Sequence, residues 1–83
     1  MAYLSAVVIT YNEATNIERC LHSLQPVADQ LLVVDSYSTD ETVTLAEQAG
    51  ADVCYHTFRS HIDQKNYAMR ASRYDHILSL DAD

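Results

Sequence analysis

The sequence predicts an α/β fold in which helices cover both faces of a parallel sheet, and three observations support this prediction. Four short apolar segments rich in β-branched residues are separated by segments with helical periodicity. Regular alternation of strand and helix is typical of parallel sheets with right-handed crossovers. The chain holds one glycine and one proline among 83 residues, which indicates continuous structure. We expect the order β-α-β-α-β-α-β within a single domain over residues 1–83.

The pattern of apolar and capping residues gives the expected bounds of each element. The first helix should start at a capping-box pattern in residues 15–18 and end before Pro26. The second should start from a similar pattern in residues 38–41 and end where Gly50 occupies the C-cap region. The third is expected over residues 63–73. The strands are expected at residues 6–10, 31–35, 51–55 and 76–80.

Composition excludes several classes of protein. A net charge of -7 and a pI near 4.7 argue against a nucleic-acid partner, because such binding depends on clustered Lys and Arg. Cys20 and Cys54 lie far apart, outside any metal-binding spacing, and are expected to be reduced thiols. The N-terminus has no signal-peptide pattern, and no segment approaches the ~20 apolar residues of a membrane span. We expect a cytoplasmic protein, peripheral to the inner face of the plasma membrane in its full-length form.

Polar residues follow three of the expected strands and form the candidate site. The carboxyl ends of parallel strands meet at one edge of a sheet, where ligands bind near the point at which strand order reverses. Hydroxyl, amide and carboxylate groups can bind a base and a ribose, and can ligate Mg²⁺ or Mn²⁺ through oxygen. The pattern favours a nucleotide diphosphate carried with a divalent metal. The candidate residues are Thr10, Tyr11, Asn12 and Glu13 after the first strand, Asp35 after the second, and Asp81 and Asp83 after the fourth.

The Asp81-Ala82-Asp83 motif is the sharpest of these signals. Alternate side chains of a strand point to the same side, so Asp81 and Asp83 are candidate metal ligands, with Asp81 also able to reach a ribose hydroxyl. The metal would neutralise charge that develops on a leaving diphosphate. Taken alone, Asp-x-Asp is more often a solvated turn at the end of a strand.

Three segments together carry a resemblance to a known family: VVITYNE at residues 7–13, VVDSYSTDET at 33–42 and LSLDAD at 78–83. Residues 5–83 resemble the family-two inverting glycosyltransferases, which have the Rossmann-like GT-A fold. The resemblance implies that Thr10, Glu13 and Asp35 lie near the base of a nucleotide-sugar donor, usually a UDP-sugar. It implies that Asp81 lies near the ribose and Asp83 on the cation, and that Lys65 approaches the diphosphate. A solvated helix face is an equally good interpretation of Lys65, and local capping is the alternative for Asp35.

The second segment departs from the family pattern. Many members read Asp-Asp-Gly-Ser where this chain reads Asp35-Ser36-Tyr37-Ser38. The variant resembles glucosyl- and heptosyl-type transferases of bacterial lipopolysaccharide core assembly, and Tyr37 could close over the base. Tyr55 and Phe58 are expected to be packing residues.

Two functional interpretations follow. The first is a glycosyltransferase fragment that binds the donor, with no catalytic residue of its own, because the base and the site for a glycan or lipid-linked acceptor are expected beyond Asp83. Its last strand would be an exposed edge, which favours a homodimer. The second is a non-catalytic nucleotide- or protein-binding module of receiver type, in which Asp35 could imitate the phosphorylated residue but Asn12-Glu13 matches the required acids poorly.

Overall fold

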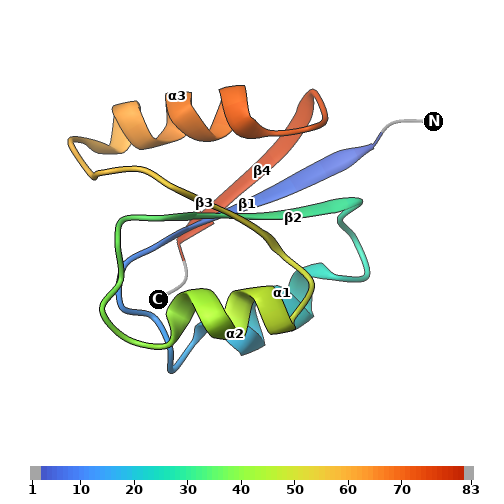
Figure 1. Cartoon of the computed structure of the whole chain (residues 1–83). Helices are drawn as coiled ribbons and strands as arrows, with labels where there is room; N and C mark the ends of the chain where they lie inside the picture. Colours follow the sequence, from blue (N-terminus) through green and yellow to red (C-terminus); the bar gives the residue numbers. More distant parts are fainter. Residues whose placement is uncertain (1–2, 82–83) are drawn as a thin grey trace.

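The computed structural model describes residues 3–81, which form a four-stranded parallel sheet with helices on both faces (Figure 1). The strands lie side by side in the order β3-β2-β1-β4. This confirms the predicted α/β fold class and element order, and each strand bound lies within two residues of its prediction. The elements are β1 (Leu4–Thr10), α1 (Ile17–Leu24), β2 (Gln30–Asp35), α2 (Thr42–Gln48), β3 (Asp52–Tyr55), α3 (His61–Ala71) and β4 (His76–Asp81).

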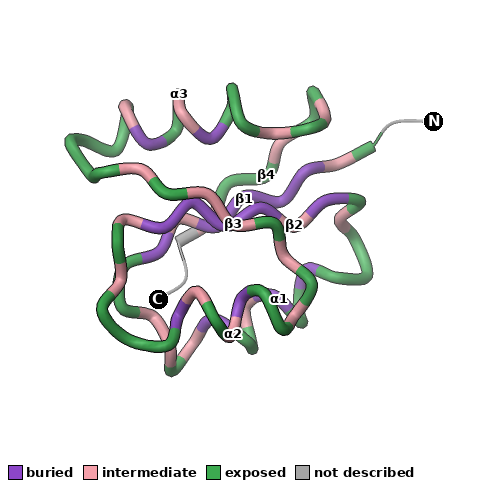
Figure 2. The backbone as a smooth tube through the Cα atoms, viewed as in Figure 1, coloured by how far each residue is buried: buried purple, intermediate pink, exposed green. Residues whose placement is uncertain are grey.

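Two apolar clusters, one on each face of the sheet, form the core. Helices α1 and α2 lie against one face and α3 against the other (Figure 1). Successive residues of a strand point to opposite faces, so Val8 packs with α1 and α2 while Val7 packs with Ala68 of α3. Figure 2 shows the buried residues concentrated in β1 and β2, whereas most of β4 is exposed. The two central strands therefore carry most of the packing.

The predicted starts of the first two helices are wrong in detail. Helix α1 starts at Ile17, and its N-cap residue makes no side-chain capping bond; instead the Glu13 carbonyl accepts from the backbone N–H groups of Asn16 and Ile17. Helix α2 starts only at Thr42, because Ser38 bonds to the preceding strand and not to the helix. The capping patterns therefore lie close to each helix start but do not cap it: no side chain caps α1, and Ser38 binds Asp35 instead of a helix N–H.

The remaining helix ends follow recognisable capping chemistry. Helix α3 starts two residues earlier than predicted, because the Ser60 hydroxyl accepts from the Asp63 N–H at 3.1 Å and caps it. Gly50 follows α2 with a φ of 90°, a conformation that residues with a Cβ adopt at a cost. The C-cap residue itself is Ala49, one position before the predicted Gly50, and Gly50 is the left-handed residue that follows it. No helix within residues 3–81 is both long and apolar enough to span a membrane.

Two buried polar pairs stand at the two ends of the β1–β2 ladder. Ser5 lies opposite Gln30, and its hydroxyl donates to the Gln30 amide oxygen at 2.7 Å. Thr10 lies opposite Asp35, and its hydroxyl donates to the Asp35 carboxylate at 2.7 Å. The Gln30 oxygen also accepts from the Arg73 N–H at 2.8 Å. The first pair therefore fixes the turn before β4, and the second stands at the edge where ligands bind in such sheets.

Candidate functional site

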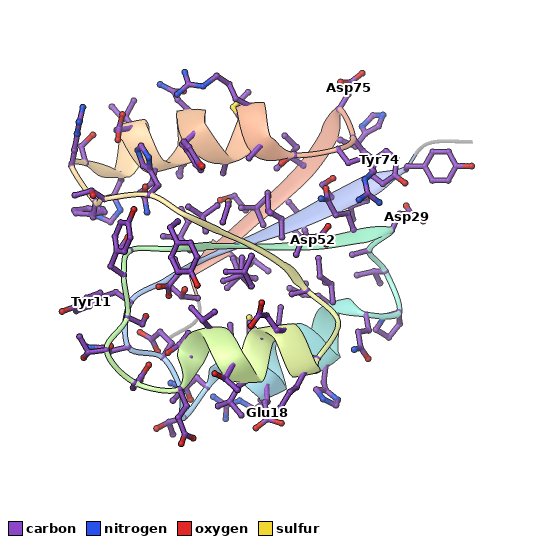
Figure 3. The ribbon with its side chains drawn as sticks, viewed as in Figure 1. Tyr11, Glu18, Asp29, Asp52, Tyr74 and Asp75 are labelled. Atoms are coloured by element: carbon purple, nitrogen blue, oxygen red, sulfur yellow. The ribbon has the colours of Figure 1, made fainter. Side chains whose placement is uncertain are left out.

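A neutral pocket of about 470 Å³ opens at the edge where β1 and β2 end, and we call it the carboxyl-edge pocket. Figure 3 shows Tyr11 at this edge, opposite Asp29, Asp52 and Tyr74 at the other end of the sheet. None of its lining residues is charged, so it suits an uncharged flat group better than a phosphate. It is lined by Ile9, Thr10, Tyr11, Ser36, Thr57 and Phe58.

The end of β4 lies next to this pocket, because β4 pairs with β1, which contributes to the pocket lining. Ile9, in the lining, pairs with Asp81 in the parallel β1–β4 ladder. The strand order also reverses here, because β1 leads by way of α1 to β2 on one side and has β4 on its other side. The backbone of Asp81 is thus beside the pocket, at the position where open α/β sheets bind ligands. Asp83, the other predicted metal ligand, lies outside the described residues.

The Asp35 carboxylate is completely buried and binds neighbouring protein groups. One oxygen accepts from the hydroxyls of Thr10 and Ser38, at 2.7 and 2.6 Å, and the other accepts from the Ser38 N–H at 2.7 Å. Hydrogen bonds to an ionised acceptor are roughly twice as strong as neutral ones. Asp35 therefore joins the end of β1 to the loop that follows β2. This geometry agrees with the local-capping alternative for Asp35.

Asn12 connects the loop after β1 to the loop after β2. Its N–H donates to the Ser38 hydroxyl at 2.8 Å, and its side-chain oxygen accepts from the Thr39 N–H at 2.7 Å. Asn12 and Tyr37 have φ values of 52° and 62°, in the left-handed region that few residues with a side chain adopt. The predicted site residue Asn12 thus holds the two loops against each other.

Asp40 forms a second connection between the same two loops. Its carboxylate accepts from the Thr42 N–H at 2.9 Å, from the Thr42 hydroxyl, and from the Ala14 N–H at 3.2 Å. The Thr42 hydroxyl bond is the main reason why the pKa of Asp40 lies below its usual value. Thr42 in turn accepts from the Glu13 N–H at 2.8 Å, and the Glu13 side chain is near Asn16. Glu13 is therefore in this junction and outside the pocket lining.

Two exposed aromatic rings line the pocket, and two more stack on each other between the loop after β2 and the end of β3. Tyr11 and Phe58 line the pocket with about half of their surface exposed. Tyr37 stacks on Tyr55 with ring centroids 5.5 Å apart, and both are also about half exposed. Phe58, which was expected to be a packing residue, packs against the His61 ring with centroids 5.3 Å apart and also lines the pocket. Exposed aromatic faces can stack on a base.

Ser36 and Gln64 were not among the predicted site residues, yet they meet at this edge. Ser36 lines the pocket, and its hydroxyl accepts from the Gln64 side-chain N–H at 2.9 Å. Gln64 is fully buried on the inner face of α3, one turn before Ala68. Its spacing of four residues from Ala68 on the same helix face is the available sequence signal.

Lys65 lies away from the carboxyl-edge pocket. It lines a second pocket of about 320 Å³ between α3 and β4, together with Met69 and Asp75 among others. Within residues 3–81, no three His, Cys, Asp or Glu side chains gather as a potential metal site. The structure thus brings Thr10 and Tyr11 together at the pocket and places Asn12, Glu13 and Asp35 in its supporting junctions.

Comparisons with known proteins agree with this architecture. An uncharacterized glycosyltransferase of Rickettsia bellii is 45% identical over 80 residues, which is 96% of this chain and 27% of that protein. One from Rickettsia felis is 43% identical over 83 residues, 29% of its length. This chain therefore spans less than a third of these relatives.

Solved structures share the fold closely. Glucosyl-3-phosphoglycerate synthase from Mycobacterium tuberculosis, in complex with Mn²⁺, UDP and glucosyl-3-phosphoglycerate, has a TM-score of 0.87 and 26% identity over 99% of this chain and 34% of that chain. The same enzyme with Mg²⁺ and UDP has a TM-score of 0.86.

The family model described as glycosyl transferase family 2 matches residues 5–83, nearly the whole chain. The chain belongs to glycosyl transferase family 2.

Proposed function

We propose that this chain binds the nucleotide-sugar donor, a UDP-sugar, for a metal-dependent glycosyltransferase. The observation that carries the proposal is the neutral, aromatic-walled carboxyl-edge pocket, whose lining residue Ile9 pairs with Asp81 of β4. A base fits the neutral pocket, and the charged diphosphate then lies toward the acidic end of β4. The structural neighbours bound to UDP with Mn²⁺ or Mg²⁺ support this assignment.

The metal belongs to the same proposal. A chain of net charge -7 repels a diphosphate unless a cation lies between them. Carboxylate oxygens are the ligands that Mg²⁺ and Mn²⁺ prefer, and Asp81 and Asp83 are the residues that would hold the ion. The bound metal would stabilise the leaving diphosphate.

The finer parts of the proposal rest on the family pattern. We infer an inverting transfer to a glycan or lipid-linked acceptor, of the kind found in lipopolysaccharide core assembly, at the inner face of the plasma membrane. Residues outside this chain would supply the general base. Family membership favours this transferase function over the receiver-like module.

The test is a calorimetric titration of UDP with Mn²⁺ and with excess chelator. We expect binding with Mn²⁺, a loss of at least about tenfold on chelation, and a similar loss in Asp81→Asn. Glu18→Gln is the matched control, since it removes the same charge from the exposed surface of α1, away from Tyr11 (Figure 3). Equal UDP affinity with metal and with chelator would overturn the metal role.

A further inference from the structure

The cations of this chain are concentrated on one side of the fold. Residues 59–73, which span α3 and its two ends, contain four of the five Lys and Arg residues and one of the 12 Asp and Glu residues. This segment therefore has a net charge of +3, and the remaining one cation and 11 acids give the rest of the chain -10. Its one acid, Asp63, is bound to the His56 ring at 2.7 Å. The exposed cations are Arg59, Lys65, Arg70 and Arg73, the last of which lies 3.6 Å from the exposed Asp52.

The opposite side of the sheet is acidic. Helix α3 lies alone on its face, while α1 and α2 cover the other face (Figure 1). Figure 3 shows Glu18 of α1 on the far side of the sheet from α3. The separation of charge across the sheet orients the basic side toward an anionic surface. The exposed acids in or next to α1 and α2 are Glu18, Asp40, Glu41 and Glu47.

Two exposed apolar side chains lie among the cations of α3. Ile62 and Met69 are 74% and 60% exposed, the most of any large apolar side chains in residues 3–81. They are seven residues apart, so they lie on the same side of α3, away from the buried Ala68. Lys65, which shares a groove with Asp75, lies within one turn of both. Single exposed apolar residues are ordinary, but apolar residues aligned on a helix among cations are typical of helices that lie on membranes.

This combination favours an anionic membrane over other partners. A second copy would bring the same positive charge against this side of α3, so electrostatic repulsion opposes self-association there. A nucleic acid would bind the cations but would leave Ile62 and Met69 in water. A lipid surface uses both kinds of residue, because Lys and Arg keep their charged ends among the headgroups while apolar side chains enter the acyl boundary.

We propose that the outer side of α3 docks this chain on a membrane that contains anionic lipid. Ile62 and Met69 insert at the headgroup boundary, and the surrounding cations bind lipid phosphates. The carboxyl-edge pocket lies just before the start of α3, since its lining residue Phe58 precedes His61 by three residues. Docking through α3 therefore holds the pocket close to a lipid-linked acceptor. That consequence rests on the proposed function, whereas the docking itself does not.

Sedimentation with vesicles tests the proposal. The chain is mixed with vesicles made of equal parts of phosphatidylglycerol and phosphatidylcholine, or with vesicles of phosphatidylcholine alone. We expect binding to the anionic vesicles that weakens at high salt, and much weaker binding to the neutral ones. Arg59→Gln/Arg70→Gln should weaken binding about fivefold for each charge removed. Ile62→Ser/Met69→Ser should weaken it at least about tenfold in all.

Arg19→Gln/Val27→Ser is the matched control. It removes an exposed cation of α1 and an apolar side chain just after α1 that is 58% exposed, so it should bind like wild type. All the substituted side chains are exposed, and circular dichroism checks that each variant folds. Equal binding to both kinds of vesicle, or α3 variants that bind like wild type, would overturn the proposal.

Two further measurements identify a different occupant of this surface. Single-stranded RNA that binds more tightly than the anionic vesicles, and equally well to Ile62→Ser/Met69→Ser, would assign the surface to a nucleic acid. A wild-type dimer that this variant loses in the absence of vesicles would assign it to a second copy. Either result would overturn the membrane role. Titration with UDP and Mn²⁺ keeps the two proposals separate: vesicle binding without UDP binding refutes only the proposed function, and UDP binding without vesicle binding refutes only the docking.

Discussion

Replacing Asp35 by asparagine separates two roles that a buried carboxylate at this position can have. In the structure its two oxygens accept three hydrogen bonds, from the Thr10 hydroxyl and from the N–H and hydroxyl of Ser38. Asparagine keeps the shape but replaces one oxygen by an NH₂ group and removes the charge. If Asp35 holds the loops, Asp35→Asn should mainly lower stability; if it contacts the base directly, the change should mainly lower UDP affinity.

The expected loss of stability follows from the three bonds. Hydrogen bonds to a charged group contribute about 1.5–3 kcal/mol each and neutral ones about 0.5–1.5 kcal/mol. The hydroxyls of Thr10 and Ser38 can rotate to accept from the new NH₂ group, so the loss is the charge assistance and not the bonds themselves. Because neighbouring terms are not additive, we expect about 2–3 kcal/mol in all. A domain of this size is stable by only about 4–12 kcal/mol, so Asp35→Ala, which leaves three donors unpaired, is less informative.

Urea unfolding at pH 7 measures this loss, with Asp29→Asn as the matched control. Asp29 is an exposed carboxylate that accepts one bond, from the Leu4 N–H at 2.7 Å, so its replacement should cost about 1 kcal/mol or less. The same proteins are titrated with UDP and CDP. If Asp35→Asn unfolds like wild type but binds UDP about ten- to a hundredfold more weakly, with less discrimination against CDP, the loop-holding role is refuted.

Three further predictions concern other parts of the chain. Gly50→Ala should cost about 1–2 kcal/mol in urea unfolding through its φ of 90° alone, since no atom lies within 4 Å of the added Cβ, and Gly50→Asn should cost less. The pKa of Asp40 is lowered in the folded chain, so its contribution to stability is fully present above the usual value of 3.8. Wild type should be more stable than Asp40→Asn at pH 7. In an acid titration of stability, this difference should start to fall below pH 3.8 and disappear once the pH is below the lowered pKa. The exposed edge strand β4 should make the chain dimerise, and sedimentation that shows a monomer at high concentration would contradict this.

Regular periodicity explains which parts of the fold could be predicted. Ile17, Leu21 and Leu24 repeat at helical spacing, and all three are buried against the sheet as that spacing requires. The predicted helix starts were wrong because the side chains of Ser, Thr and Asp can bind a loop residue far along the chain as readily as a helix N–H. Ser38 pairs with Asn12, 26 residues away, and no local pattern reveals such a partner.

The candidate site could be predicted only where it follows a strand end. Thr10 and Tyr11 were found because the edge of a parallel sheet is fixed by strand order. Phe58, Ser36 and Gln64 were missed as site residues because their positions depend on how α3 and the loop after β3 lie on the sheet. A buried glutamine and a solvated one have the same letter in the sequence, and tertiary packing alone distinguishes them.

The polar pairs at the ends of the β1–β2 ladder also decide how the two strands align during folding. The four residue pairs between them are all apolar, so shifting one strand by two residues would still place apolar side chains opposite one another. Ser5 and Gln30, and Thr10 and Asp35, are each 25 positions apart, and both pairs form only in the native alignment. A shifted ladder would bury these polar groups without partners, at about 1–3 kcal/mol each. These costs destabilise the shifted registers, so the two strands pair in the one register that places Thr10 opposite Asp35.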